Sequence, residues 1–321
     1  MNLIEQAAKR LEELRLAGVE VPDSAPARHI EPKLAPIPTP VPTPAPVPVP
    51  AVAEKAPAPR PAVVPSPPVL NDAVLVKSRL VTLQMEQLAA AGLIYPNAPR
   101  SQLADEFRVI KRPLIANAMG KGAAPVKNGN LIMVTSALPH EGKSFTAANL
   151  AISIAMELDK TVMLVDADVA RPSLLKMLGL PPAPGLLDVL VNETNDLSGV
   201  LLRTNIETLT ILPSGTPHVR ATELLASDAM NNLLEEMATR YPDRIIIFDS
   251  PPLLVTTESR VLAAHMGQIV MVVRAEGTLQ SEVRHALGTI EACPVKMMLL
   301  NQVKSSKHSE YGYGYGYGYG G

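Results

Sequence analysis

The stretch LIMVTSALPHEGKSF, residues 131–145, joins a β-rich apolar run to a helical segment through a short loop. The loop matches the pattern G-x-x-x-x-G-K-[ST], except that Ala137 stands at the first glycine position. Such a loop turns its backbone N–H groups inward around phosphates, and the helix start adds its positive dipole end. We therefore expect Gly142 to permit close approach, Lys143 to reach the β- and γ-phosphates, and the Ser144 hydroxyl to bind Mg²⁺.

From residue 130 onward, short β-rich runs alternate with helical segments. The strand candidates are Leu131–Thr135, Thr161–Val165, Leu209–Leu212, Arg244–Phe248, Gln268–Val273 and Val295–Leu300. The helical candidates are Phe145–Leu158, Ala221–Arg240, Ser259–Ala264 and Ser281–Glu291, and residues 69–128 also carry helical spacing, beginning with Leu80. Apolar strands separated by helices are typical of a mostly parallel sheet covered on both faces, so the sequence predicts an α/β fold.

Three aspartates directly follow strand candidates. Asp166 and Asp168 come after the second candidate, and Asp249 comes after the fourth. Ligands bind at the carboxyl ends of the strands in open α/β sheets, so these carboxylates should meet at the same edge as the loop. Because three acids would otherwise repel one another, we expect a cation among them. The alternative for any single aspartate is a helix N-cap.

Charge and cysteine content exclude several functions. The 321 residues include 29 Lys and Arg against 31 Asp and Glu, which gives a net charge of −2. A nucleic-acid-binding surface usually shows as a basic excess, so no nucleic-acid partner is expected. Cys293 is the only cysteine, which excludes an intrachain disulfide and a CxxC redox pair. The apolar runs are shorter than the ~18–20 residues that span a bilayer, and we expect a soluble, cytoplasmic protein.

The chain divides into four parts. They are an N-terminal amphipathic helix (1–21), a disordered Pro-rich linker (22–68), the phosphate-loop domain with a helical lead-in (69–305) and a Tyr/Gly-rich tail (306–321). The first helix either frays or docks on a partner or on the chain's own core. The linker holds 17 of the 32 prolines, and a semi-rigid spacer is favoured over a ligand for a proline-binding module.

Four motifs carry a family resemblance. They are SALPHEGKS at 136–144, VDADVARP at 165–172, IIFDSPP at 246–252 and the terminal tyrosine cluster. Together they resemble the bacterial tyrosine kinases of exopolysaccharide systems, most closely the cytoplasmic autokinases associated with exosortase-type loci. The resemblance implies a P-loop NTPase fold and an ATP-dependent protein tyrosine autokinase that uses Mg²⁺ and regulates exopolysaccharide synthesis or export.

The resemblance also implies roles for individual residues. Asp166 is implied to be the catalytic base, and Lys143 to stabilise the transferring phosphoryl group. Ser144, Asp168 and Asp249 are implied to serve Mg²⁺. The implied nucleotide-binding residues are Pro139, His140, Glu141, Gly142, Lys143, Ser144, Phe145 and Asn301. The asparagine resembles the residue that reads adenine in related ATPases, although an Asn at a strand end is often a turn residue.

Assembly and location also follow from the resemblance. The family's oligomerisation motif, an acid followed by two arginines, corresponds to Asp105, Arg108 and Lys111. Lysine lacks the bidentate fork of arginine, and His140 stands where family members usually have glycine. The family implies a homo-oligomeric ring and a separate membrane adaptor of the polysaccharide chain-length-determinant type. That adaptor would recruit the cytoplasmic protein to the inner face of the plasma membrane.

The nearest competing class is a partitioning-type regulatory P-loop ATPase without protein kinase activity. That class has a second lysine five residues before Lys143, where this chain has Leu138. The tail favours the kinase, because a tethered phenol can be placed in line with the γ-phosphate while a carboxylate takes its proton. The expected phosphoacceptors are Tyr311, Tyr313, Tyr315, Tyr317 and Tyr319. The alternative is a sticky low-complexity tail without catalytic meaning.

Overall fold

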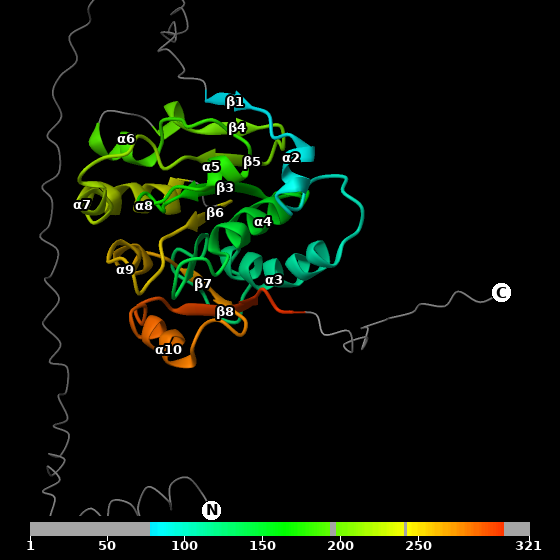
Figure 1. Ribbon diagram of the computed structural model, residues 1–321. Coiled ribbons are helices and arrows are strands. Elements are labelled where there is room, and N and C mark those ends of the chain that lie inside the picture. Colours follow the sequence, from blue (N-terminus) through cyan, green and yellow to red (C-terminus); the bar gives the residue numbers. More distant parts are fainter. Residues whose placement is uncertain (1–77, 193–196, 241–242, 305–321) are drawn as a thin grey trace, which may run out of the picture. The chain divides into compact units, whose positions relative to one another are not determined.

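The computed structural model describes residues 78–192, 197–240 and 243–304 (Figure 1). The helix expected at 1–21, the linker at 22–68 and the tail from 306 onward, with its five acceptor tyrosines, lie outside the described residues. Within the described ranges, no helix is both long and apolar enough to cross a membrane.

The strands of the described residues form one eight-stranded sheet. They are β1 (Arg79–Val81), β2 (Leu131–Ser136), β3 (Thr161–Asp166), β4 (Leu202–Thr204), β5 (Leu209–Leu212), β6 (Arg244–Asp249), β7 (Gln268–Arg274) and β8 (Val295–Asn301). The spatial order is β1-β4-β5-β3-β6-β2-β7-β8, and all neighbours are parallel except β4 and β5. Because β3, β6 and β2 are consecutive, their carboxyl ends share one edge of the sheet.

The central strands are buried on both faces. Every residue of β2 is buried, and so are residues 245–249 of β6. Successive residues of β6 contribute to opposite sides, since Ile246 and Phe248 belong to one core and Ile245 and Ile247 to the other. A continuous apolar run is what a strand covered by helices on both faces requires.

Helices cover both faces of the sheet (Figure 1). One core includes side chains of α2 (Met85–Ala90), α3 (Gln102–Ala118), α4 (Lys143–Ala155) and α5 (Leu174–Met177). The other includes side chains of α6 (Leu186–Val191), the 3₁₀ turn Leu197–Gly199, α7 (Ala221–Leu225), α8 (Asp228–Arg240), α9 (Glu258–Ala263) and α10 (Gln280–Gly288). The predicted α/β fold with a mostly parallel sheet is confirmed.

All six strands expected from the sequence are present, none differing by more than one residue at either end. Two details differ. The helix expected over 221–240 is divided, because Ser227 begins a new helix by accepting a hydrogen bond from the Met230 amide at 3.3 Å. Leu80, expected in a helical segment, lies in the short edge strand β1, and β4 was not expected. Strands of three residues are too short to show a pattern.

Candidate active site

The loop after β2 has the backbone conformation that its glycine requires. Gly142 precedes α4 with a φ of 95°, in the left-handed region. A Cβ atom there would be strained by this φ and would lie 2.0 Å from Nδ2 of Asn301, so that side chain would have to move. His140 also has a positive φ, 65°, a conformation that glycine adopts more readily than histidine. The expected succession of strand, loop and helix is therefore present.

Ala137 occupies the first glycine position of the motif without conflict. It is fully buried and belongs to the same core as Leu131 and Met133 of β2. Its carbonyl accepts a hydrogen bond from the Leu254 amide at 3.2 Å. The extra methyl group therefore fills space in the core.

The Lys143 ammonium lies among acidic side chains. Its Nζ donates to Oδ2 of Asp168 at 2.6 Å and to Oγ of Ser144 at 3.3 Å, and Oδ1 of Asp249 is 3.9 Å away. Burial alone would lower the pKa of Lys143, but the negative charges of Asp249 and Asp168 outweigh burial and raise the pKa. Lys143 is therefore a firmly protonated cation at the end of the loop.

Asp166 and Asp249 end the neighbouring strands β3 and β6 in register. Both are buried, and Oδ2 of Asp166 accepts from the Leu174 amide at 3.2 Å. Within the described residues, Oδ1 of Asp166 and both carboxylate oxygens of Asp249 have no hydrogen-bond partner. Burial, reinforced by the charge of Asp249, raises the pKa of Asp166 to about 7. Burial also raises the pKa of Asp249 to about 6, against the opposing charge of Lys143.

The donor atoms at this edge suit magnesium, which prefers oxygen ligands. The carboxylate oxygens of Asp249, which lack a hydrogen-bond partner among the described residues, and the hydroxyl of Ser144 are of this kind. No cluster of three or more His, Cys, Asp or Glu side chains in the described part of the chain is placed to hold an ion by itself. The ammonium of Lys143 lies among the acids, while the metal ion expected there stays a prediction. Because Mg²⁺ usually takes one or two protein ligands together with phosphate oxygens and water, the residues fit a shared site.

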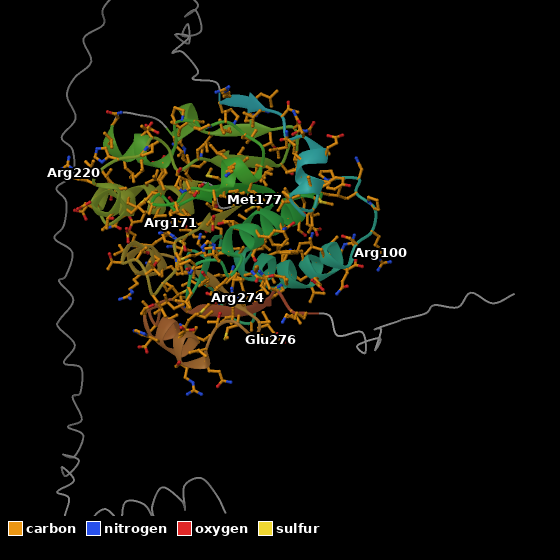
Figure 2. All side chains as sticks on the ribbon, in the orientation of Figure 1. Arg100, Arg171, Met177, Arg220, Arg274 and Glu276 are labelled. Atoms are coloured by element: carbon orange, nitrogen blue, oxygen red, sulfur yellow. The ribbon has the colours of Figure 1, made fainter. Side chains whose placement is uncertain are left out.

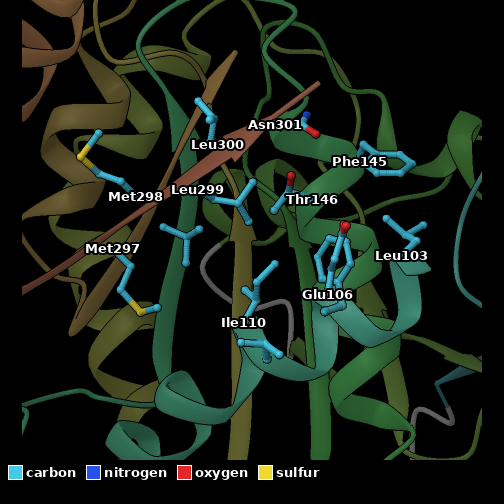
Figure 3. Close-up of a pocket in the computed structure, with 13 residues that line it drawn as sticks. Leu103, Glu106, Ile110, Phe145, Thr146, Met297, Met298, Leu299, Leu300 and Asn301 are labelled. Atoms are coloured by element: carbon cyan, nitrogen blue, oxygen red, sulfur yellow. The ribbon is translucent and has the colours of Figure 1, made fainter. Parts of the chain in front are cut away.

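Asn301 ends β8 and contacts the outer side of the loop. Its Nδ2 donates to the backbone carbonyl of Glu141 at 2.9 Å. Figure 3 shows Asn301 and Phe145 at one end of a cavity of about 470 Å³. Apolar side chains of α3 and β8, such as Ile110 and Leu299, line most of this cavity. An apolar cavity with one convergent amide is typical of a small-molecule site.

Two exposed arginines border the site (Figure 2). The backbone N–H of Arg171 donates to Oδ1 of Asp168 at 3.2 Å. Arg274 ends β7, and its backbone N–H donates to Oε1 of Glu141 at 3.4 Å. The two residues therefore contact the site through their backbone, and each carries a positive charge in its exposed side chain.

Two contacts of the site could not be expected from the sequence. The Ser173 hydroxyl donates to the Ser144 hydroxyl at 3.1 Å, and the Thr278 hydroxyl donates to Oε1 of Glu141. The partners are 29 and 137 residues apart along the chain. No local pattern marks such pairs, because the fold alone brings them together.

The three residues of the expected oligomerisation motif do not share one exposed surface. Asp105 accepts from Nη1 of the exposed Arg108 at 2.7 Å and from Nε of Arg100 at 3.0 Å. Lys111 is only 6% exposed, donates to the Ser153 carbonyl at 2.5 Å and pairs with Glu157 at 2.6 Å. The Lys111 ammonium is thus engaged within its own chain, against α4, and a subunit contact through this residue stays a prediction.

The fold and site define a class of protein. A family model described as an AAA domain matches residues 132–293. A mostly parallel sheet with this loop at its carboxyl edge is a P-loop nucleotide-binding domain.

Comparison with known proteins narrows the class. The chain is 32% identical over 223 residues to tyrosine-protein kinase YwqD of Bacillus subtilis, covering 69% of this chain and 90% of that one. It is 32% identical over 223 residues to the succinoglycan biosynthesis transport protein ExoP of Rhizobium meliloti, covering 68% of this chain and 27% of that one. The solved kinase domain of VpsO is 27% identical with a TM-score of 0.51, covering 64% of this chain and 100% of that one. The chain belongs to the bacterial tyrosine-protein kinases, enzymes that transfer a phosphoryl group to tyrosine side chains of proteins.

Proposed function

We propose that this chain uses ATP and Mg²⁺ to phosphorylate the tyrosines at its own C-terminus. The observation that carries the proposal is the position of Asp166. One of its carboxylate oxygens is buried and unpartnered, at the same sheet edge as Lys143 and the phosphate loop. A carboxylate with a pKa near 7 is suited to take a proton from a phenol that attacks a phosphoryl group.

The residues of the site have separate tasks in this proposal. The backbone N–H groups of 140–145 surround the phosphates, and Asn301 together with Phe145 faces the base from the cavity. Ser144 and Asp249, with Asp168, hold the metal ion. When bound, Mg²⁺ neutralises charge on the phosphate oxygens.

Lys143 must exchange one partner for another. In the ligand-free site its ammonium pairs with Asp168 at 2.6 Å. A triphosphate in the loop offers a stronger anion, so Lys143 turns to the transferring phosphoryl group and frees Asp168 for the metal. The same ammonium therefore offsets part of the negative charge of the ligand-free site and stabilises the charge that develops during transfer.

The tail supplies the acceptors and a means of regulation. Five tyrosines alternate with glycine between 311 and 320. Full phosphorylation adds about −7.5 to −10 charges per tail, at ~1.5–2 per phosphate, which is large beside a net charge of −2. Such repulsion expels the tail from the active site and loosens a homo-oligomeric ring.

The proposal extends to a biological setting. One relative is named for succinoglycan biosynthesis and transport, and we assign this chain to the control of exopolysaccharide synthesis or export. The protein acts in the cytoplasm, at the inner face of the plasma membrane, through a separate membrane adaptor of the polysaccharide chain-length-determinant type.

Intact-mass analysis after incubation with Mg²⁺ and ATP tests the central step. The wild-type protein should gain up to five phosphoryl groups, because the tail holds five tyrosines. The Asp166→Asn variant should gain almost none while still binding ATP. Nucleotide hydrolysis with an unchanged protein mass would instead identify a regulatory ATPase.

A further inference from the structure

Glu141 places a carboxylate inside a loop that has to receive a polyphosphate. A negative charge at this position opposes anion binding unless the side chain serves another purpose. Glu141 is only 2% exposed, and Oε2 accepts from the Leu138 amide within the same loop at 2.7 Å. The buried carboxylate of Glu141 thus joins two residues of the same loop, Leu138 and Glu141, by a hydrogen bond.

The other oxygen of this carboxylate is held from outside the loop. Oε1 accepts from the Arg274 amide at 3.4 Å and from the Thr278 hydroxyl. Both donors belong to the end of β7 and the turn that leads to α10. Glu141 is therefore the link between the phosphate loop and this turn.

The turn is itself fixed, so it can serve as a support. The amides of Gly277 and Thr278 donate to the Arg274 carbonyl at 3.3 and 3.2 Å, and the Ala275 amide donates to the Asn301 carbonyl at 2.9 Å. Thr278 is thereby attached to two strands of the sheet, and its hydroxyl approaches Glu141 from a rigid base.

The carbonyl groups of the loop are held on the same outer side. The side chain of Gln302 donates to the His140 carbonyl at 3.2 Å, and that of Asn301 donates to the Glu141 carbonyl at 2.9 Å. These two hydrogen bonds hold the backbone orientation of His140 and Glu141, on which the direction of the N–H groups that would face a phosphate depends. Preorganised donors of this kind bind an anion without the cost of rearrangement.

We propose that Thr278 is a positioning residue for nucleotide binding, acting through Glu141 to hold residues 138–142 in the phosphate-receiving conformation. The inference rests on the proposed function, in which this loop binds ATP. It assigns a role to a residue outside every motif of the sequence, on the turn between β7 and α10.

Two substitutions of Thr278 test the proposal. Thr278→Val keeps the β-branched shape and removes the hydroxyl, whereas Thr278→Ser keeps the hydroxyl. By calorimetry with Mg²⁺ and ATP, the valine variant should bind about tenfold more weakly, because a hydrogen bond to a charged group is lost. The serine variant should bind within about threefold of wild type. In autophosphorylation the valine variant should show a higher KM for ATP and a nearly unchanged kcat.

A matched control separates positioning from general stability. The Thr289 hydroxyl donates to the Ala286 carbonyl at 2.7 Å just after α10, away from the loop. Thr289→Val removes a comparable hydrogen bond and should leave ATP affinity unchanged, whatever its effect on Tm. Wild-type affinity in Thr278→Val overturns the proposal, even if its Tm falls.

Glu141→Gln distinguishes a positioning role of Glu141 from simple charge repulsion. We call the hydrogen bonds of the Glu141 carboxylate to Leu138, Arg274 and Thr278 the brace. The brace predicts weaker ATP binding, because an amide cannot accept at both positions. It also predicts that adding Thr278→Val to Glu141→Gln causes little further loss. Tighter binding by Glu141→Gln overturns the brace. Failure of the wild-type protein to bind ATP is a separate outcome, which refutes the proposed function before the brace is tested.

Discussion

Asp166 and Asp249 are register partners at the carboxyl ends of β3 and β6, and the amide next to Asp166, that of Ala167, donates to the Asp249 carbonyl at 2.8 Å. The sheet therefore holds two buried carboxylates side by side. Burial removes water from each carboxylate and so raises its pKa. Ionising both groups therefore lowers the free energy of unfolding. The site is thus less stable than an ordinary sheet edge, as sites built for chemistry often are.

Asp249→Asn should stabilise the fold at pH 8. Because the pKa of Asp249 is raised from 3.8 to about 6, its contribution to stability is present at low pH and lost as pH rises through 6. An amide of the same size avoids this loss. Each gain of about 1 kcal/mol in the free energy of unfolding should raise Tm by about 2–4 °C. Thermal unfolding at pH 8 and pH 5 checks this expectation. The gain should shrink at pH 5, and a lower Tm at pH 8 would contradict it.

Tail phosphorylation should rise with pH through neutrality. Asp166 accepts a proton only when ionised, and burial raises its pKa to about 7. The kcat/KM for autophosphorylation should therefore fall about tenfold per pH unit below 7 and level off above it. Initial rates between pH 5.5 and 8.5 provide the measurement. Asp166→Asn should be slow at every pH, and a flat wild-type profile would remove Asp166 as the base.

Lys143→Met should abolish phosphotyrosine and also lower stability. The substitution removes the cation that pairs with Asp168 and approaches Asp249. Leaving buried carboxylates without a counter-charge costs about 2–4 kcal/mol at pH 8 and less at pH 5. Phosphotyrosine blotting and thermal unfolding measure the two effects. Lys160→Met, which removes a lysine outside the site, is the control; retained phosphotyrosine in Lys143→Met would indicate another kinase.

Substitutions of Lys111 and Arg108 should affect different properties: the first the stability of the fold, the second the assembly of subunits. Lys111→Met removes the ammonium that binds the Ser153 carbonyl and Glu157, so unfolding should become easier by about 1–2 kcal/mol. Arg108→Ala changes an exposed side chain, so it should leave Tm nearly unchanged and weaken any oligomer. Sedimentation velocity alongside thermal unfolding tests the pair. An unchanged Tm together with a weakened oligomer in Lys111→Met would instead support a subunit contact by Lys111.

Removal of Tyr311–Gly321 should eliminate most autophosphorylation while leaving ATP affinity unchanged. The described domain ends its last strand at Asn301, so the cut lies outside all described contacts of the nucleotide site. Phosphopeptide mapping and calorimetry measure the two properties. Heavy labelling of the truncated protein would contradict the expectation and indicate that the acceptor is Tyr95 or Tyr241.

Much of the fold could be predicted because it depends on local pattern. Apolar runs such as Ile245–Phe248 indicate a strand buried on both faces. An acid that directly follows such a run is therefore placed at the carboxyl end of the strand. The burial of Lys111 could not be predicted, since spacing along α3 does not reveal which side α4 covers. The contact between Glu141 and Thr278 joins residues 137 apart and exists only once β2 and β7 are paired.

The junction of Asn301 with the phosphate loop has a consequence for how reaction rate depends on protein amount. Tyr311 is ten residues beyond Asn301, a length that spans at most about 33–36 Å. The tether therefore limits how far Tyr311 can be from Asn301 and the phosphate loop. In the proposed homo-oligomeric ring, such a tether would present the tyrosines to a neighbouring site at a local concentration of about millimolar. Dilution should therefore slow labelling only where it takes subunits apart, so the cell could control the enzyme by gathering it rather than by making more.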